Sequence, residues 1–373
     1  MARGPATMRE RSRTRTPSSG PGTKHLRGIR AQEDYARRGG RLTRRARRYT
    51  PDMRPLAALG LALALAGCSV ISIDLTPRIR PLEEQTVEGR GEAKILLMDV
   101  SGFISDEGSG PILTIGAEPP RVPMLVRIRE ELTKAAADDD VRALVLRINS
   151  PGGTVTASDI IYREVELFRR QRKIPVVAVL MDVAASGGYY IALAADTIIA
   201  HPTTVTGSIG VIMLTVNAQG LLDKLGVSTS TIKSGPRKDM GSPFRQLTDD
   251  ERTIFQSVID ELQAQFLKKV AEQRGMPIDR ARHLADGRIY TAEQALANHL
   301  VDQVGYMDDA ILAAKRAAGV DRARVVVYHR PREYRATYYA QAQSAEPRTA
   351  TAWSQFAALV GGAGPRFLYL WWP

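Results

Sequence analysis

The chain has 373 residues, of which 44% are hydrophobic and 25% are charged, and this globular composition excludes a collagen-like or wholly disordered protein. Its single cysteine excludes an intramolecular disulfide and a thiolate metal cluster within one chain. The net charge of +12 would suggest a polyanionic partner, but residues 1–52 hold 15 Lys and Arg against 4 Asp and Glu and so carry +11 of it.

The basic segment 1–52 has few apolar residues to bury, so we expect a disordered tail or a stretch that precedes a mis-assigned start of translation. It lacks the alternation of basic and aromatic residues, and the basic helix, that nucleic-acid-binding arms use. We therefore predict no nucleic-acid partner.

A signal peptide is predicted over residues 53–67. Met53 and Arg54 supply a start and a positive charge, and the apolar run after them is too short for a membrane span but suits a signal-peptide core. The run ends in Leu65–Cys68 (LAGC), which resembles a bacterial lipobox, in which the cysteine receives lipid. The sequence predicts that Cys68 anchors the chain by lipid to the cell membrane, facing the periplasm, with the outer membrane as an open alternative.

Residues 68–92 are polar and predict a tether, followed by a domain over 93–330. In that domain, apolar runs that predict strands alternate with helical patterns. Strands are expected at 93–100, 141–148 and 175–180, and helices at 122–137, 156–171, 186–195 and, after a capping box, from 248 onwards. This alternation implies right-handed crossovers and a parallel α/β sheet covered by helices.

The last segment, residues 331–373, is polar and ends in an aromatic tail. For this tail we weigh contact with the bilayer, whose interface favours tryptophan, against packing on a neighbouring subunit.

Two turns between a predicted strand and a helix carry candidate chemistry. Asn149–Gly153 follows one strand, and its paired glycines allow backbone N–H groups to face a ligand, as in an oxyanion hole, or make an ordinary loop. Ser186 opens the helix after the next strand, where unpaired N–H groups favour a developing negative charge. Ser186 is therefore either a nucleophile or a simple N-cap, which is the commoner role of such a serine.

A serine nucleophile needs a base. His201 is one candidate, because it follows the Ser186 helix by one strand. Lys233 and Lys238, in the polar stretch 232–243, are the others. The alternative for each of the three is a solvated side chain, which is the commoner role of a loop histidine and of a lysine in a polar loop.

Together these segments resemble the signal peptide peptidase A family, bacterial Ser/Lys peptidases of the Clp protease/crotonase superfamily. The resemblance runs from about residue 94 to 314 and rests on five motifs in the family's order: 149–153, 182–196, 206–212, 234–245 and 287–302. Ala292 and His299 stand where the family usually has glycine. The resemblance implies a Clp protease/crotonase-like parallel sheet with flanking helices, built from superhelical βαβ repeats.

The resemblance also implies roles for individual residues. Ser186 matches the nucleophile, Lys238 the general base, and Ser208 the hydroxyl that orients the lysine. The oxyanion donors match backbone amides of three glycines: Gly152, Gly153 and Gly187. No metal and no cofactor are expected.

A neutral Lys238 requires its pKa to fall by roughly three units from about 10.4, which burial can supply. Asp239 must then point away, because a close carboxylate would keep the proton on the amine.

The function implied is a membrane-tethered serine endopeptidase that degrades remnant signal peptides and other small apolar peptides. Its expected assembly is a ring-like homo-oligomer in which Lys238 of one subunit serves Ser186 of the next. A crotonase-type enzyme acting on acyl-CoA and a non-catalytic lipoprotein scaffold are the alternatives.

Overall fold

The computed structural model describes residues 80–106, 122–331, 336–340 and 366–371. The predictions for residues 1–67 and for the lipidation of Cys68 therefore lie outside the described residues. Within the described ranges, no helix is both long enough and apolar enough to span a membrane.

A nine-stranded sheet forms the centre of the fold, in the order β1-β11-β2-β3-β5-β6-β10, with β7 paired to β5 and β9 to β7. Its strands are β1 (Glu83–Gly89), β2 (Lys94–Ser101), β3 (Val141–Ser150), β5 (Val176–Ala185), β6 (Thr197–Ala200), β7 (Val205–Gly207), β9 (Ile289–Thr291), β10 (Gln303–Val304) and β11 (Arg324–His329). All pairs are parallel except β1–β11 and β7–β9. The predicted parallel α/β sheet is confirmed.

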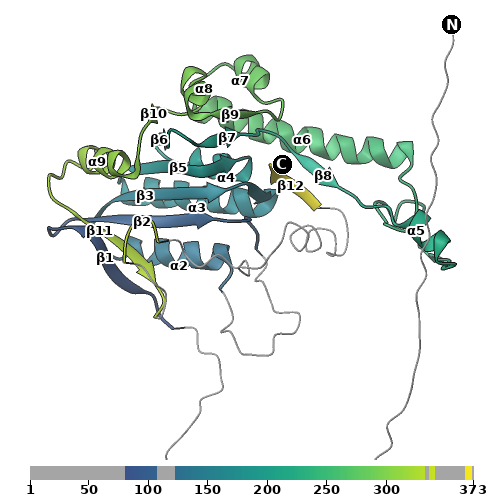
Figure 1. Cartoon of the computed structure of the whole chain (residues 1–373), viewed down its shortest axis with the longest axis horizontal. Helices are drawn as coiled ribbons and strands as arrows, with labels where there is room; N and C mark the ends of the chain where they lie inside the picture. Colours follow the sequence, from purple (N-terminus) through teal and green to yellow (C-terminus); the bar gives the residue numbers. More distant parts are fainter. Residues whose placement is uncertain (1–79, 107–121, 332–335, 341–365, 372–373) are drawn as a thin grey trace, which may run out of the picture. The chain divides into compact units, whose positions relative to one another are not determined.

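Helices cover both faces of this sheet (Figure 1). The helices of the described residues are α2 (Met124–Ala136), α3 (Val155–Arg172), α4 (Gly187–Ala192), α5 (Gln219–Lys224), α6 (Asp249–Gln273), α7 (Ile278–Leu284), α8 (Ala292–Ala297) and α9 (Met307–Ala317), and α5 alone among them lies well away from the sheet. Because side chains alternate along a strand, Leu96 and Met98 of β2 join the core under α2, α3 and α4, whereas Ile95 and Leu97 join the core under α9. Burial on both faces explains why these strands read as continuous apolar runs.

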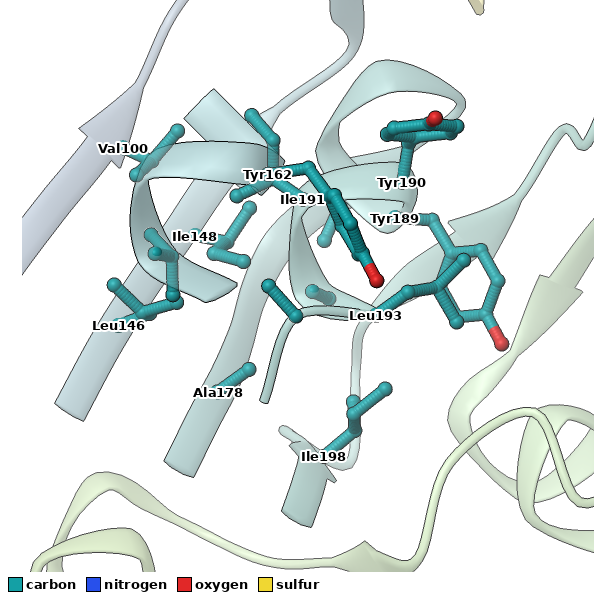
Figure 2. Packing of buried hydrophobic residues seen from close by; sticks show 14 of the residues in the cluster. Val100, Leu146, Ile148, Tyr162, Ala178, Tyr189, Tyr190, Ile191, Leu193 and Ile198 are labelled. Atoms are coloured by element: carbon teal, nitrogen blue, oxygen red, sulfur yellow. The ribbon is translucent and has the colours of Figure 1, made fainter. Parts of the chain in front are cut away.

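The larger of the two cores fixes α4 on the sheet. Figure 2 shows Leu146, Ile148 and Ala178 of the central strands beneath Tyr189 and Ile191 of α4. All five side chains are fully buried. The start of α4, which carries the chemistry discussed below, is therefore held by a packed core rather than by a loose loop.

Part of the expected tether is a strand. Residues 83–89 form β1, which pairs antiparallel with β11, with an irregular register between Thr86 and Glu88. β1 lies at the edge of the sheet and leaves Glu83, Thr86 and Glu88 exposed. Its sequence is therefore polar and lacks the apolar pattern by which a strand is predicted.

The C-terminal tail also departs from expectation. Residues 366–370 form β12, the middle strand of a second sheet between β4 (Gly152–Thr154) and β8 (Ile212–Leu214), antiparallel to both. Leu368, Tyr369 and Leu370 are buried within their own chain. Neither the bilayer nor a neighbouring subunit is needed to cover these three residues.

Two local features at helix ends can be compared with the sequence. The capping box at the start of α6 is confirmed, because Thr248 Oγ1 accepts from the Glu251 amide at 3.2 Å while the Glu251 carboxylate accepts from the Thr248 amide at 3.1 Å. His299, at a position where the resembling family has glycine, takes a φ of +59°. The backbone thus keeps the left-handed turn that glycine adopts easily.

Candidate active site

Ser186 lies at the carboxyl end of the parallel sheet, between the end of β5 and the start of α4. A side chain from the neighbouring strand fixes this connection, because Asn149 Oδ1 accepts a hydrogen bond from the Val183 amide at 3.1 Å. Ligands of open α/β sheets bind at this edge, outside the carboxyl ends of the strands.

The backbone of Ser186 is strained. Its φ of +52° and ψ of −112° fall outside the regions that residues with a side chain prefer. The side chain makes no capping hydrogen bond to α4, so the simple N-cap interpretation is wrong. Its hydroxyl instead points towards the Gly210 carbonyl oxygen, at 3.5 Å, and the residue is fully buried. A serine at a sharp strand-to-helix turn is typical of a nucleophile.

The glycine turn after β3 packs directly against the start of α4. Gly152 has a φ of +106°, and a Cβ atom added to it would lie 2.9 Å from the Gly187 amide nitrogen. A Cβ added to Gly187 would lie 3.2 Å from the Gly152 Cα and from the Gly153 amide nitrogen. Gly152, Gly153 and Gly187 are therefore brought together beside Ser186, as predicted for oxyanion donors. The Gly152 amide donates at 3.1 Å to Ser150 Oγ in this structure.

Ser208 is also placed next to the nucleophile candidate. In the parallel pair β5–β7, Ala185 lies opposite Gly207, and the Ser186 amide donates to the Gly207 carbonyl oxygen at 2.8 Å. Ser208 follows with a φ of +50° and is nearly buried. The strand register therefore places Ser208 beside Ser186, where its hydroxyl could orient a base.

Lys238 is not brought to Ser186 within one chain. It lies in the excursion 218–243, whose ends are joined by a hydrogen bond of 2.7 Å from the Ala218 amide to the Pro243 carbonyl oxygen. This excursion, with α5, projects away from the central sheet (Figure 1). The Lys238 side chain is exposed, and no hydrogen bond or ion pair of its amine is found among the described residues.

The neighbours of Lys238 are held by a charged cluster. Asp239 accepts from Lys233 Nζ at 2.7 Å and from the Arg245 guanidinium at 2.8 Å, so its carboxylate is engaged elsewhere than at Lys238. Arg245 and then Lys233 hold the pKa of the Asp239 carboxyl well below its usual value. Arg245 also binds Glu251 and lowers the pKa of that carboxyl to about 2.

This cluster weakens the case for Lys233 as the base. Its amine donates to Asp239 and, at 3.0 Å, to the Pro236 carbonyl oxygen. These two bonds hold the amine within the excursion, and no contact with Ser186 is found among the described residues.

His201 does not reach the site either. Its Nδ1 lies 2.8 Å from Thr203 Oγ1, and its ring meets the Tyr306 ring edge-on with centroids 5.0 Å apart. A Ser/His pair is therefore absent from the described part of the chain. The same residues contain no group of three or more His, Cys, Asp or Glu side chains that could hold a metal ion.

Sequence reasoning missed two features of the site. One is the Gly210 carbonyl beside Ser186, which the Thr206–Ile212 motif could have suggested. The other is β12, which runs across the glycine turn. Its signal in the sequence was the aromatic run near the C-terminus.

The parallel sheet, the strained serine after β5 and the glycine turn after β3 define a Clp-protease-type serine hydrolase. The Clp protease model matches residues 120–206, and the model of Peptidase family S49 matches residues 168–321. A solved structure of a ClpP1 mutant from Listeria monocytogenes overlaps 58% of this chain and 94% of its own, with 17% identity and a TM-score of 0.37.

Two curated relatives narrow the class of serine hydrolase to one family. The “Putative signal peptide peptidase SppA” of Enterococcus faecium is 37% identical over 246 residues, which cover 66% of this chain and 70% of that protein. The chloroplastic “Serine protease SPPA” of Arabidopsis thaliana is 35% identical over 231 residues, 62% of this chain but only 33% of that longer protein. The chain belongs to the signal peptide peptidase A family of peptidase family S49, and it is a serine peptidase.

Proposed function

We propose that this chain is a membrane-tethered endopeptidase that cleaves remnant signal peptides and other small apolar peptides, with Ser186 as nucleophile and Lys238 as general base. The observation that carries the proposal is the strained, buried Ser186 set against the Gly152 and Gly187 backbone in a chain of family S49. The name of the Enterococcus relative describes a signal peptide peptidase and supports the substrate class.

The chemistry follows from the geometry. Ser186 Oγ loses its proton to the amine and attacks the scissile carbonyl carbon, whose oxygen becomes negatively charged. Backbone amides of Gly187 and of Gly152 or Gly153 stabilise this oxygen, a contribution typically worth 10²–10³-fold in rate for each donor. The amine then protonates the leaving nitrogen, and a water activated by the same amine releases the acyl group from Ser186.

In this proposal the base comes from a second subunit. A lysine titrates near 10.4 in water, and burial is the main means of lowering that value towards neutrality. Lys238 is exposed in the single chain and its neighbour Asp239 is turned to Lys233 and Arg245. In our proposal, contact with the next copy of the chain buries Lys238 beside that copy's Ser186, and Ser208 orients the amine there.

Exposed apolar side chains on the same excursion support this assembly. The large ones are Leu221, Leu225, Val227 and Ile232, exposed by 61, 66, 48 and 100%, and Phe244, directly after the excursion, is exposed by 48%. A cluster of this kind on a soluble domain is typical of a protein–protein contact. A second copy of the chain is the partner that would cover these side chains and, through the same contact, complete the site.

Cleavage assays of three variants test the proposed residues. Ser186→Ala and Lys238→Ala should each lose peptide cleavage by 10²–10⁴-fold or more, because nucleophile and base act as a unit. Lys233→Ala, in the same loop, should keep most of it. A serine-directed covalent probe should label wild type but not Ser186→Ala; an unlabelled but acyl-CoA-active chain would indicate a crotonase-type enzyme, and an unchanged Ser186→Ala a scaffold.

Membrane tethering is tested separately. The Leu65–Cys68 motif leads us to propose lipidation of Cys68 and loss of the residues before it, with the chain on the periplasmic side of the membrane. Labelled fatty acid should enter the wild-type chain and not Cys68→Ala. Membranes that contain the unprocessed chain starting at Met1 would contradict the proposal.

A further inference from the structure

Strand β5 contains a bulge shortly before its end. Ile148 of β3 lies opposite Leu180 of β5. Ser150, two positions further along β3, lies opposite Ala184, which is four positions further along β5. The surplus residues of β5 therefore lie within 181–183. Bulges are frequent beside active sites, where they change the direction in which a side chain points.

The bulge is also the place where β5 changes its partner on the other side. Up to Leu180, β5 pairs with β6, whereas from Val183 onwards it pairs with β7. This change brings the end of β5 to Gly207, whose carbonyl oxygen accepts from the Ser186 amide at 2.8 Å. The position of Ser186 therefore depends on how the bulge is held.

Two threonine hydroxyls hold the carbonyl groups in and around the bulge. Thr204 Oγ1 donates a shared hydrogen bond to the carbonyl oxygens of Met181, at 2.6 Å, and Leu180, at 2.8 Å. Thr206 Oγ1 donates to the Ala184 carbonyl oxygen at 2.6 Å. Both threonines are buried, so bulk water is not available to replace a hydroxyl that is lost.

A third side chain acts on the amide side of the bulge. Asn149 Oδ1 accepts from the Val183 amide at 3.1 Å. A bulge interrupts the regular ladder of hydrogen bonds between strands. In β5, side chains from both neighbouring segments supply bonds at the interruption, and two of them, Thr204 and Thr206, have no other role in the site described above.

We propose that Thr204 and Thr206 are positioning residues for the peptidase reaction, because their hydroxyls hold the β5 bulge in the shape that places Ser186 Oγ for attack. The inference rests on the proposed function, since it takes Ser186 as the nucleophile. Each threonine acts through the backbone of β5. A displacement of about 1 Å at a reacting group is enough to slow an enzyme about 10²-fold, so such a hydroxyl contributes to the rate without touching the substrate.

Two variants of the full chain separate the hydroxyl of Thr206 from its methyl group. Thr206→Val keeps the shape and loses the hydroxyl, so kcat should fall by about 10–10²-fold while KM stays within about twofold. Thr206→Ser keeps the hydroxyl and loses the methyl group, so kcat should stay within about threefold of wild type. The comparison is made at a temperature at which circular dichroism shows each variant to be folded. A purely structural role then predicts wild-type kcat for Thr206→Val, and that result overturns the inference.

Thr203→Val is the matched control. Thr203 lies three residues before Thr206, is exposed, and contacts the His201 ring instead of β5. Its variant should leave kcat and KM unchanged, and a loss as large as that of Thr206→Val would overturn the inference. Thr204→Val and Thr204→Ser repeat the comparison at the other hydroxyl and decide the question if Thr206→Val does not fold.

Amide hydrogen exchange gives a readout that needs no cleavage. The segment 181–187 should exchange at least about tenfold faster in Thr206→Val than in wild type, and at the wild-type rate in Thr203→Val. Unchanged exchange in Thr206→Val would show that its hydroxyl does not hold the bulge.

The two proposals fail separately. If a serine-directed probe does not label Ser186 of the wild-type chain while Thr206→Val still exchanges faster, the proposed nucleophile is wrong and the hold on the bulge stands. If the probe labels Ser186 equally fast in wild type and in Thr206→Val, the positioning role is wrong and the proposed function stands.

Discussion

Ser186 keeps its unfavourable backbone conformation because the residues around it are fixed on both sides. Its amide donates to the Gly207 carbonyl oxygen and its carbonyl accepts from the Tyr190 amide, both at 2.8 Å. Strain of about 1–3 kcal/mol at such a residue persists only where the surrounding structure determines it. Here the packed core under α4 supplies that constraint, and the result is a hydroxyl held at one position.

A methyl group on Gly152 tests how closely the glycine turn after β3 is packed. Gly152→Ala would put a Cβ atom 1.9 Å from the Tyr369 carbonyl oxygen at a φ of +106°, so the turn must move. We expect at least a 10²-fold loss of peptide cleavage and about 2–3 kcal/mol of lost stability, measured by kinetics and urea unfolding.

Gly319→Ala is the control away from the site. A Cβ atom there meets nothing within 4 Å, so activity should be unchanged, and its φ of +65° should cost about 1–2 kcal/mol of stability. Equal losses of cleavage in the two variants, or none in Gly152→Ala, would show that the turn does not have the packing described here.

The positions of the glycines and of Ser186 could be predicted from sequence because each follows directly after a buried strand. The environment of Lys238 could not. Its exposure depends on where the excursion 218–243 projects, and its freedom from Asp239 depends on Arg245, which lies six residues beyond Asp239. Local patterns carry no information on either.

At the scale of elements, the central strands of the large sheet were predictable, whereas β1 and β12 were not. β2, β3 and β5 are apolar on both faces and stand out in the sequence. β1 is polar and lies at the sheet edge, so it has no hydrophobic signature, and β12 is apolar but pairs with strands that lie far away in the chain. Pairing with strands that are distant in the sequence, rather than a local sequence pattern, determines that these two segments form strands.

The junction between the excursion and α6 depends on pH through Glu251. Arg245 lowers its pKa from the ordinary 4.5 to about 2. A carboxyl with a lowered pKa stabilises the folded state above its unfolded pKa, and this contribution is lost as the pH falls through the folded value. Glu251→Gln should therefore melt slightly below wild type at pH 7, by about 2 °C after screening by solvent, and the gap should close between pH 4.5 and 2.

Thermal unfolding of both proteins at a series of pH values measures this gap. The Glu251→Gln side chain keeps a carbonyl oxygen that can accept from the Thr248 amide. The capping box should therefore be present in both proteins and should not contribute to the difference between them. A gap that widens as the pH falls would contradict the assigned role of the Arg245–Glu251 pair.

For the whole molecule, one chain brings Ser186 and the glycine turn together but leaves Lys238 exposed to solvent. The excursion 218–243 that carries Lys238 also carries exposed apolar side chains. Contact with a second copy would bury both together, so assembly and activity are linked in this account. Dilution that separates the subunits should then reduce cleavage per chain.

Mixing two inactive variants tests this central claim most directly. Ser186→Ala retains the lysine and Lys238→Ala retains the serine, so a site shared between subunits is restored wherever the two meet in the right order. In randomly mixed rings about one interface in four carries both intact groups, and co-expression should recover roughly a quarter of wild-type cleavage. Mixed assemblies that form but remain inactive at every ratio would contradict the shared site.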